Sequence, residues 1–219
     1  MKKLCSFLMI FTMLLAGTAC SSNTTNREVP STEPQENTPS PVSTENPENQ
    51  EVSSETPEGI SKSLVVYFSW SGNTQNVAES IQNQTDADIF EIIPQTPYSD
   101  DYDTVVDFAQ EEQRADARPT IAGSIENIAQ YDVIYVGFPN WWGDMPMILY
   151  TFFDSYDLSG KTIAPFCTSG GSGLSNTVNE IKSLEPGAAV TKGLHISSGS
   201  SSNPEHAVSA WLDDIGLAK

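Results

Sequence analysis

A short segment after the first apolar run combines small hydroxyl-bearing side chains with one glycine, a combination that can bind an anion. Ser69, Ser71 and Thr74 supply the hydroxyl groups. Gly72 would let the backbone approach a ligand closely, and Asn73 or Thr74 would cap the helix that follows. The backbone N–H groups and the dipole of that helix favour negative charge at its start. The segment has no lysine or arginine, so neutral donors alone would hold a phosphate.

The spacing of these residues excludes two common phosphate loops. A P-loop needs a lysine after its second glycine, and a dinucleotide fingerprint needs three spaced glycines. Neither is present here. The alternative interpretation is an ordinary Ser/Gly turn between a strand and a helix.

A second segment carries two adjacent tryptophans and consists of Pro139, Asn140, Trp141, Trp142 and Gly143. Large aromatic side chains in a loop indicate that something flat packs on them, because stacking uses both their area and their ring quadrupole. An isoalloxazine ring is such a partner. Alternatively, one or both indoles fold back onto the helix that follows.

A third segment is rich in glycine and contains Thr168, Ser169, Gly170, Gly171 and Gly173. Its backbone could approach the edge of a ring and donate N–H groups to ring carbonyls. A turn without any ligand is the alternative.

From residue 62 onward, short apolar runs alternate with helical patterns, which is typical of a parallel sheet with helices on both faces. In such open sheets the ligand lies beyond the carboxyl ends of the strands. Each polar segment follows an expected strand or starts an expected helix, so all three should lie at the same end of the sheet. We expect strands at 63–68, 87–93, 132–138, 161–167 and 188–196, and helices at 74–84, 102–115, 145–156, 173–184 and 204–216, the last capped by Asn203.

In order and spacing, the three segments resemble the phosphate loop and the two ring-binding loops of the flavodoxin family. The resemblance covers nearly all of residues 62–219 and implies an α/β fold, a flavodoxin-like three-layer sandwich with a five-stranded parallel sheet of order 2-1-3-4-5. It implies FMN as the cofactor. The tyrosine that the family usually places beside the ring has no clear equivalent. The residues implied for the phosphate are Ser69, Ser71, Gly72, Asn73 and Thr74, and those implied for the ribityl chain and ring are Pro139, Asn140, Trp141, Trp142, Gly143, Thr168, Ser169, Gly170, Gly171 and Gly173.

Two functions fit this resemblance, because the same fold hosts both. One is an electron-transfer flavoprotein that exchanges electrons with a redox protein. The other is an FMN-dependent NAD(P)H:quinone or nitro-compound reductase. No cluster of basic residues is evident that would hold a dinucleotide phosphate, which favours the carrier. A surface-binding module without flavin is a third interpretation.

Few other residues suggest chemistry. His195 and His206 are isolated, and no Cys/His set has metal-ligand spacing, so we expect no metal site. Cys167 ends an expected strand and is interpreted as a small buried hydrophobe.

The first 61 residues do not have the composition of a folded domain. Lys2 and Lys3 precede an apolar run and then Cys20, an arrangement that resembles a bacterial lipoprotein signal; an ordinary cleaved signal peptide is the alternative. We expect a signal peptide at 1–19, a lipid on Cys20 and a disordered acidic linker, rich in Ser, Thr, Pro and Glu, at 20–61. The protein would then be extracytoplasmic and attached to the bacterial cell membrane through a lipid anchor only.

The net charge of −19 restricts the partners. Nucleic acid and anionic lipid would both be repelled, whereas a basic redox protein would be attracted. We expect a monomer.

Overall fold

A parallel sheet forms the centre of the part of the chain that the computed structural model describes, residues 61–219. The strand order is β2-β1-β5-β6-β7, with β8 also paired to β6, and this confirms the predicted order 2-1-3-4-5. The strands of this sheet are β1 (Ser63–Tyr67), β2 (Asp88–Glu91), β5 (Val133–Pro139), β6 (Thr162–Ser169), β7 (Ala189–Val190) and β8 (Leu194–Ser197).

The predictions for the start of the chain lie outside the described residues. These are the signal peptide at 1–19, the lipid on Cys20 and the linker up to residue 60. Within residues 61–219, no helix is both long enough and apolar enough to cross a membrane.

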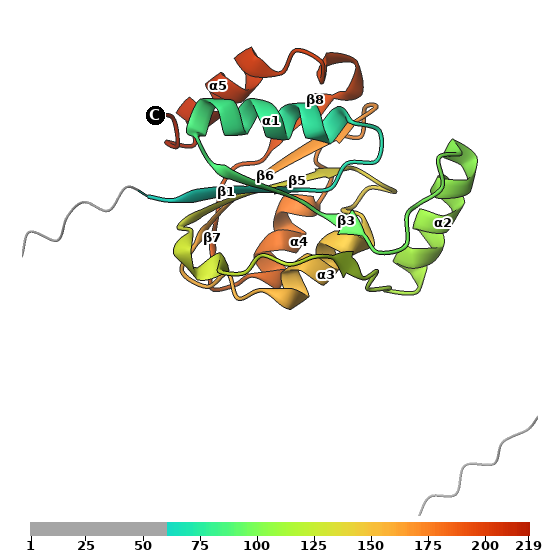
Figure 1. Ribbon diagram of the computed structural model, residues 1–219. Coiled ribbons are helices and arrows are strands. Elements are labelled where there is room, and N and C mark those ends of the chain that lie inside the picture. The colour runs from blue at the N-terminus through green and yellow to red at the C-terminus, as the bar shows by residue number, and fades with distance from the viewer. Residues whose placement is uncertain (1–60) are drawn as a thin grey trace, which may run out of the picture. The chain divides into compact units, whose positions relative to one another are not determined.

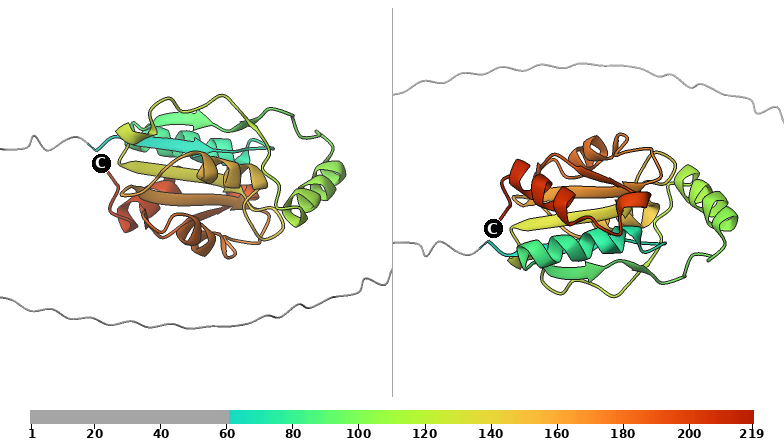
Figure 2. Two further views of the ribbon diagram at one scale, coloured as in Figure 1. Left: turned by 90° about the horizontal axis from the view of Figure 1, so that it is seen from below. Right: turned by 90° about the horizontal axis from the view of Figure 1, so that it is seen from above.

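Helices cover both faces of the sheet, as the three-layer prediction requires. Helices α1 and α5 lie on one face, and α3 and α4 lie on the other (Figure 1). Helix α2 lies instead beyond the carboxyl end of the strands (Figure 2). The helices are α1 (Asn73–Thr85), α2 (Tyr102–Arg114), α3 (Met147–Ser155), α4 (Thr177–Leu184) and α5 (Glu205–Asp214), with short 3-10 turns at η1 (Ile128–Gln130) and η2 (Ser198–Ser200).

Two hydrophobic clusters pack against the two faces of the sheet. In β1, Leu64 and Val66 belong to the cluster that contains α3, while Val65 and Tyr67 belong to the cluster that contains α1. Successive side chains of a strand point to opposite faces, so both sets are buried. This explains why the apolar run in β1 is continuous rather than alternating.

The predicted fifth strand is two short strands, β7 and β8, that both pair with β6. The interruption lies at 191–193, where the Lys192 carbonyl accepts a hydrogen bond from Trp211 Nε1 at 2.9 Å. Gly193 fits closely there, because a Cβ atom at this position would lie 3.0 Å from side-chain atoms of Leu174 and Val178.

Several predicted helix starts are wrong, each for a local reason. Neither Asn73 nor Thr74 caps α1; Gly72 occupies the cap with φ of 81°, which favours glycine. Helix α3 starts two residues later than predicted, because Pro146 disfavours a helical conformation in the residue before it. Helix α4 starts four residues late because left-handed residues precede it, with φ of 65° at Gly173 and 50° at Ser175. Helix α5 is preceded by Pro204 rather than Asn203 at its cap.

Helix α2 belongs to an excursion of the chain that the sequence did not predict. The excursion is closed at its base by an antiparallel pair, β3 (Ile93–Pro94) with β4 (Ile121–Ala122). Inside it, Tyr98 Oη donates a hydrogen bond to Glu112 Oε2 of α2 at 2.9 Å. Thr151 Oγ1 of α3 donates to the Pro119 carbonyl, also at 2.9 Å. These contacts fix α2 at the end of the sheet where the polar loops lie.

The buried Glu112 makes the attachment of α2 sensitive to pH. Burial raises the pKa of Glu112, although the hydrogen bond from Tyr98 opposes this. Between the unfolded and the folded pKa of Glu112, the folded protein holds a proton on this carboxyl group that the unfolded chain releases. The contribution of Glu112 to stability is therefore fully present below the unfolded pKa and is lost as pH rises through the folded pKa. Glu112→Gln keeps an acceptor for Tyr98 and cannot ionise. We expect the melting temperature of the variant to exceed that of the wild type by a margin that grows from about pH 4 upward.

The matched control is Glu111→Gln, an exposed position on the same helix. Its melting temperature should follow the wild type across the pH range. Parallel curves for Glu112→Gln and the wild type would show that Glu112 carries no ionisation cost.

Candidate functional site

The loop between β1 and α1 presents backbone donors that have no protein partner. Within the described residues, none of the N–H groups at 70–74 donates a hydrogen bond. Helix α1 begins at Asn73, so part of this set consists of the free N–H groups of a helix start. A Cβ atom at Gly72 would meet nothing within 4 Å, so its left-handed backbone and not lack of space explains the glycine. Such a loop is suited to an anion.

The hydroxyl groups of this loop add further donors. Ser69 Oγ is buried and has no hydrogen-bond partner in the part of the chain that the structure describes. Ser71 Oγ accepts a hydrogen bond from Asn73 Nδ2 at 2.9 Å, so its own proton stays available. Thr74 Oγ1 and Thr168 Oγ1 lie 2.8 Å apart. One proton suffices for that bond, so the other hydroxyl of the pair can donate elsewhere.

Asn73 is occupied by protein contacts. Its Oδ1 accepts a hydrogen bond from Ser201 Oγ at 2.7 Å, while its Nδ2 holds Ser71. The side chain therefore orients the Ser71 hydroxyl and links α1 to the segment that follows β8.

The loop after β5 is a two-residue turn. The backbones of Trp141 and Asp144 exchange both hydrogen bonds, at 2.9 and 3.0 Å. Between them, Trp142 and Gly143 have φ of 55° and 83°, and positive φ at both central residues defines a type I′ turn. A left-handed conformation is unusual for a side chain as large as Trp142, and such strain is found mainly at functional sites.

The two indoles of this turn have different surroundings. Trp141 is partly buried and lies edge-on to Phe68 and Tyr98, with ring centroids 5.4 and 5.3 Å away. Trp142 is half exposed, and its Nε1 donates a hydrogen bond to the Val106 carbonyl of α2 at 3.0 Å. One indole is thus held by the aromatic core and the other by α2.

The glycine-rich loop after β6 uses part of its backbone internally. Ser169 Oγ accepts hydrogen bonds from Gly171 N at 3.2 Å and Gly173 N at 3.1 Å, and it lies 2.8 Å from His195 Nε2. Ser169 is buried, so its hydroxyl is engaged with the protein. The N–H groups of Gly170 and Ser172 donate no hydrogen bond within residues 61–219.

Hydrogen bonds join the three predicted segments at one end of the sheet. Thr74 contacts Thr168, as described above, and Asn140 N donates to the Thr168 carbonyl at 2.8 Å. Asn140 Nδ2 also donates to the Gly173 carbonyl at 2.9 Å. Pro139 ends β5 opposite Thr168 in the strand register. The expectation that the segments converge is therefore confirmed.

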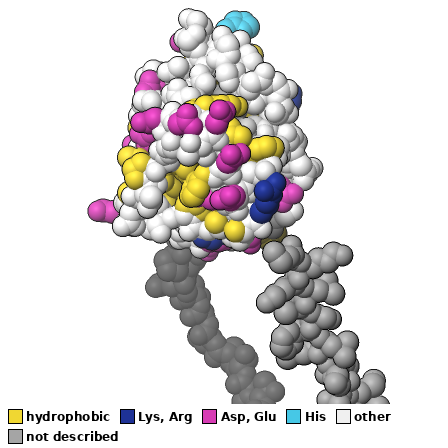
Figure 3. Space-filling model, turned by 90° about the vertical axis from the view of Figure 1, so that its right-hand side faces the viewer, with side chains coloured by type: hydrophobic (Ala, Val, Ile, Leu, Met, Phe, Trp, Pro, Cys, Tyr) yellow, Lys and Arg dark blue, Asp and Glu magenta, His cyan; other side chains and the backbone are white. Residues whose placement is uncertain are grey.

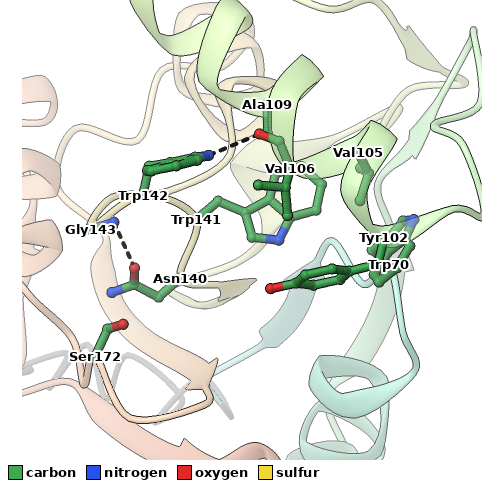
Figure 4. A pocket seen from close by; sticks show the side chains of 10 residues that line it. All are labelled: Trp70, Tyr102, Val105, Val106, Ala109, Asn140, Trp141, Trp142, Gly143 and Ser172. Atoms are coloured by element: carbon green, nitrogen blue, oxygen red, sulfur yellow. Dashed lines mark hydrogen bonds between the residues drawn. The ribbon is translucent and has the colours of Figure 1, made fainter.

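A cavity of about 330 Å³ lies between the tryptophan turn and α2 (Figure 4). None of its lining side chains is charged, and most are apolar or aromatic, which is the usual character of a small-molecule site. The lining residues are Trp70, Tyr102, Val105, Val106, Ala109, Asn140, Trp141, Trp142, Gly143 and Ser172.

Five of these lining residues were not predicted, whereas Ser172 belongs to the segment from Thr168 to Gly173 that was expected to line the ribityl chain and ring. Trp70 lies inside the first polar segment, so an aromatic side chain between Ser69 and Ser71 was a signal that the sequence offered. Tyr102, Val105, Val106 and Ala109 belong to α2, and no local pattern indicates that this helix faces the loops.

The remaining candidate residues carry no separate site. Cys167 is fully buried, and burial raises the pKa of its thiol to about 12, which confirms it as a small hydrophobe. In the described part of the chain, no group of three or more His, Cys, Asp or Glu side chains is placed to hold a metal ion.

Comparison with known proteins supports a single family. The family model described as flavodoxin matches residues 62–215. No curated protein matches the chain.

Solved structures give the same result. A candidate flavoprotein from Bacteroides eggerthii DSM 20697 is 36% identical over 71% of this chain and 98% of its own, with a TM-score of 0.64. One from Bacteroides uniformis ATCC 8492 is 32% identical over 70% and 98%, with a TM-score of 0.61. A flavoprotein from Lactobacillus acidophilus NCFM, solved in complex with FMN, is 25% identical over 67% and 99%, with a TM-score of 0.55. With a family model that spans most of its length and a relative above 30% identity, the chain belongs to the flavodoxin family.

Proposed function

We propose that this protein binds FMN and carries electrons. The observation that carries the proposal is the donor set after β1, in which the buried Ser69 Oγ and the N–H groups at 70–74 have no hydrogen-bond partner within residues 61–219. A buried hydroxyl without a partner costs about 1–3 kcal/mol, so a ligand that accepts its proton is the natural explanation. The similar flavoprotein from Lactobacillus acidophilus NCFM, solved in complex with FMN, supports the choice of ligand.

The phosphate of FMN fits the chemistry of this loop. A monophosphate offers several acceptor oxygens, and the loop offers only donors: backbone N–H groups, the Ser69 and Ser71 hydroxyls and one proton of the Thr74–Thr168 pair. No cation is needed, because the start of α1 supplies a favourable dipole.

The isoalloxazine ring fits the aromatic cavity. Trp141 and Trp142 would lie beside it, and the free N–H groups of Gly170 and Ser172 are the donors available for its carbonyl edge. When bound, FMN would supply the redox chemistry, while the protein binds it, orients it and controls its surroundings.

The outer surface of α2 suits a protein partner. Tyr102 and Trp142 line the cavity and are 66% and 50% exposed, and Phe108 of α2 is also 50% exposed. Acidic side chains lie among hydrophobic ones on this side of the molecule, as Figure 3 shows. The exposed acids of α2 include Asp103, Asp107 and Glu111. This combination favours docking of a basic redox protein, since its charge would steer the encounter and the apolar side chains would be buried.

A reductase with its own small substrate is the second candidate. Val105, Val106 and Ala109 of α2 give the cavity an apolar wall against which a flat quinone or nitro compound could pack. The lining contains no lysine or arginine that would hold the phosphates of NAD(P)H, and this favours the carrier.

A visible spectrum of the purified full-length protein distinguishes these functions. After FMN is added and the excess removed, we expect a retained flavin spectrum and a higher melting temperature, as ligand linkage requires. Stepwise uptake of single electrons, with exchange that slows as salt is added to a basic partner, would support the carrier. Direct reduction by NAD(P)H would favour the reductase. A colourless protein that FMN does not stabilise would contradict FMN binding and leave only a binding module.

Ser69→Ala should separate ligand binding from stability. A hydrogen bond to a charged group contributes about 1.5–3 kcal/mol, so we expect FMN affinity to fall about tenfold or more. The ligand-free variant loses a buried hydroxyl without a partner, so its melting temperature should stay the same or rise. Isothermal titration and thermal unfolding measure the two effects.

Ser209→Ala, at an exposed position of α5, is the control and should change neither quantity. Unchanged affinity in Ser69→Ala, or a less stable ligand-free protein, would argue against a role for this hydroxyl in binding the phosphate.

We also propose that the protein is attached to the outer face of the bacterial cell membrane through a lipid on Cys20. The arrangement of Lys2, Lys3, an apolar run and Cys20 supports this, and the acidic residues at 20–61 would space the domain from the membrane. We further propose a monomer that does not bind nucleic acid, in keeping with the net charge of −19.

Cys20→Ala tests the anchor. Expressed in a bacterium that processes lipoproteins, the wild type should sediment with membranes and the variant should not. If both proteins were released in soluble form, the ordinary signal peptide would be the better interpretation.

A further inference from the structure

We propose that His195 is a positioning residue for the glycine-rich loop at 170–173. By accepting the hydroxyl proton of Ser169, it leaves that oxygen free to hold the loop. The inference rests on the proposed function, in which this loop lies beside the flavin ring.

The first step is a count of lone pairs on Ser169 Oγ. A serine hydroxyl has one proton to donate and two lone pairs that accept. The N–H groups of Gly171 and Gly173 can only donate, and their distances to this oxygen are 3.2 and 3.1 Å. They use both lone pairs. The third contact, His195 Nε2 at 2.8 Å, must therefore receive the serine proton.

This count determines the tautomer of His195. An Nε2 atom that accepts a hydrogen bond carries no proton, so the ring is neutral and its proton is on Nδ1. A proton on Nε2 would bring three donors to an oxygen with two lone pairs, and one of the two glycine contacts would be lost. Serine and histidine thus hold the loop as a pair.

The N–H groups of the loop at 170–173 alternate between those bonded to Ser169 and those without a partner in residues 61–219, and this shows why Ser169 and His195 matter for a ligand. Gly171 and Gly173 direct their N–H groups to Ser169. Those of Gly170 and Ser172 have no partner among the described residues, and Ser172 lines the aromatic cavity. The hydrogen bonds from Gly171 and Gly173 to Ser169 therefore favour a loop conformation in which the N–H groups of Gly170 and Ser172 stay available to a flavin ring.

Further hydrogen bonds connect Ser169 and His195 to the tryptophan turn. The Gly173 carbonyl accepts a hydrogen bond from Asn140 Nδ2 at 2.9 Å, and Asn140 Oδ1 accepts one from Gly143 N at 3.0 Å. A continuous chain of hydrogen bonds thus runs from His195 through Ser169 and Gly173 to the turn that carries Trp141 and Trp142. A histidine on β8 positions both loops that would surround the ring.

The strand pattern places His195 for this task. Its neighbours Leu194 and Ile196 belong to the core on the α1 side of the sheet, so His195 points to the opposite face. Its register partner in β6 is Cys167, two residues before Ser169, and side chains two apart share a face. The imidazole reaches Ser169 along that face.

Two variants of His195 test the proposal through FMN affinity. His195→Gln keeps an oxygen that can accept the Ser169 proton, and His195→Leu has a similar volume and no acceptor. We expect His195→Gln to stay within about threefold of the wild type and His195→Leu to bind FMN about tenfold more weakly or worse. His206→Leu, at an exposed position of α5, should have no effect. Equal affinities for the two His195 variants would overturn the proposal.

Nuclear magnetic resonance of the ligand-free protein gives a second readout that does not depend on FMN. The ring ¹⁵N shifts of wild-type His195 should report a proton on Nδ1, and the Gly171 and Gly173 amides should exchange faster in His195→Leu than in His195→Gln. A proton on Nε2 would overturn the proposal, even if His195→Leu failed to fold. If the wild type bound no FMN, the proposed function would fail, while the tautomer would still decide the role of His195 in the loop.

Discussion

The parallel pairing of β1, β5 and β6 is the constraint on which the rest of the site depends. The register places Tyr67 beside Gly137 and Pro139 beside Thr168, so the three strands end at one edge. Close packing enforces this register, because a Cβ atom at Gly137 would lie 2.1 Å from the ring of Phe166 on the next strand. The pairing continues past the strands, since Asn140 N donates to the Thr168 carbonyl. The strand pairing therefore determines where each of the three loops begins.

Most of the fold could be predicted because its signals are local. Residues that are close in the sequence and buried together leave a recognisable apolar pattern. Examples are the continuous apolar run of β1 and, in α5, the stripe of Val208, Trp211 and Leu212. The position of α2 could not be predicted in this way. It depends on contacts such as Trp142 Nε1 with the Val106 carbonyl, 36 residues apart in the chain, and on the β3–β4 pair, in which two residues per strand leave no periodicity to detect.

The candidate site, like the fold, could be predicted from the sequence only in part. The small polar residues of the three loops were identifiable, since hydroxyls and glycines after apolar runs are unusual enough to notice. The sequence did not indicate which of their hydrogen-bonding groups are free. Ser69 and Ser169 look alike in the sequence, yet among the described residues the hydroxyl of Ser69 has no partner and that of Ser169 has three. Two of these contacts come from the glycine-rich loop, and the third comes from His195, which lies on another strand and had no local sign of a role.

An acidic protein that binds an anionic cofactor must overcome its own field. The net charge of −19 repels a phosphate at long range, but salt screens that repulsion beyond about 8–10 Å. At contact distance the balance changes, because the N–H groups at 70–74 and the Ser69 hydroxyl have no hydrogen bond to another described residue that a ligand would have to break. In the proposed binding mode, these donors would replace the lysine of other phosphate loops. Because the proposed binding mode needs no cation at the phosphate, the acidic surface of α2 would remain available to attract the proposed basic partner.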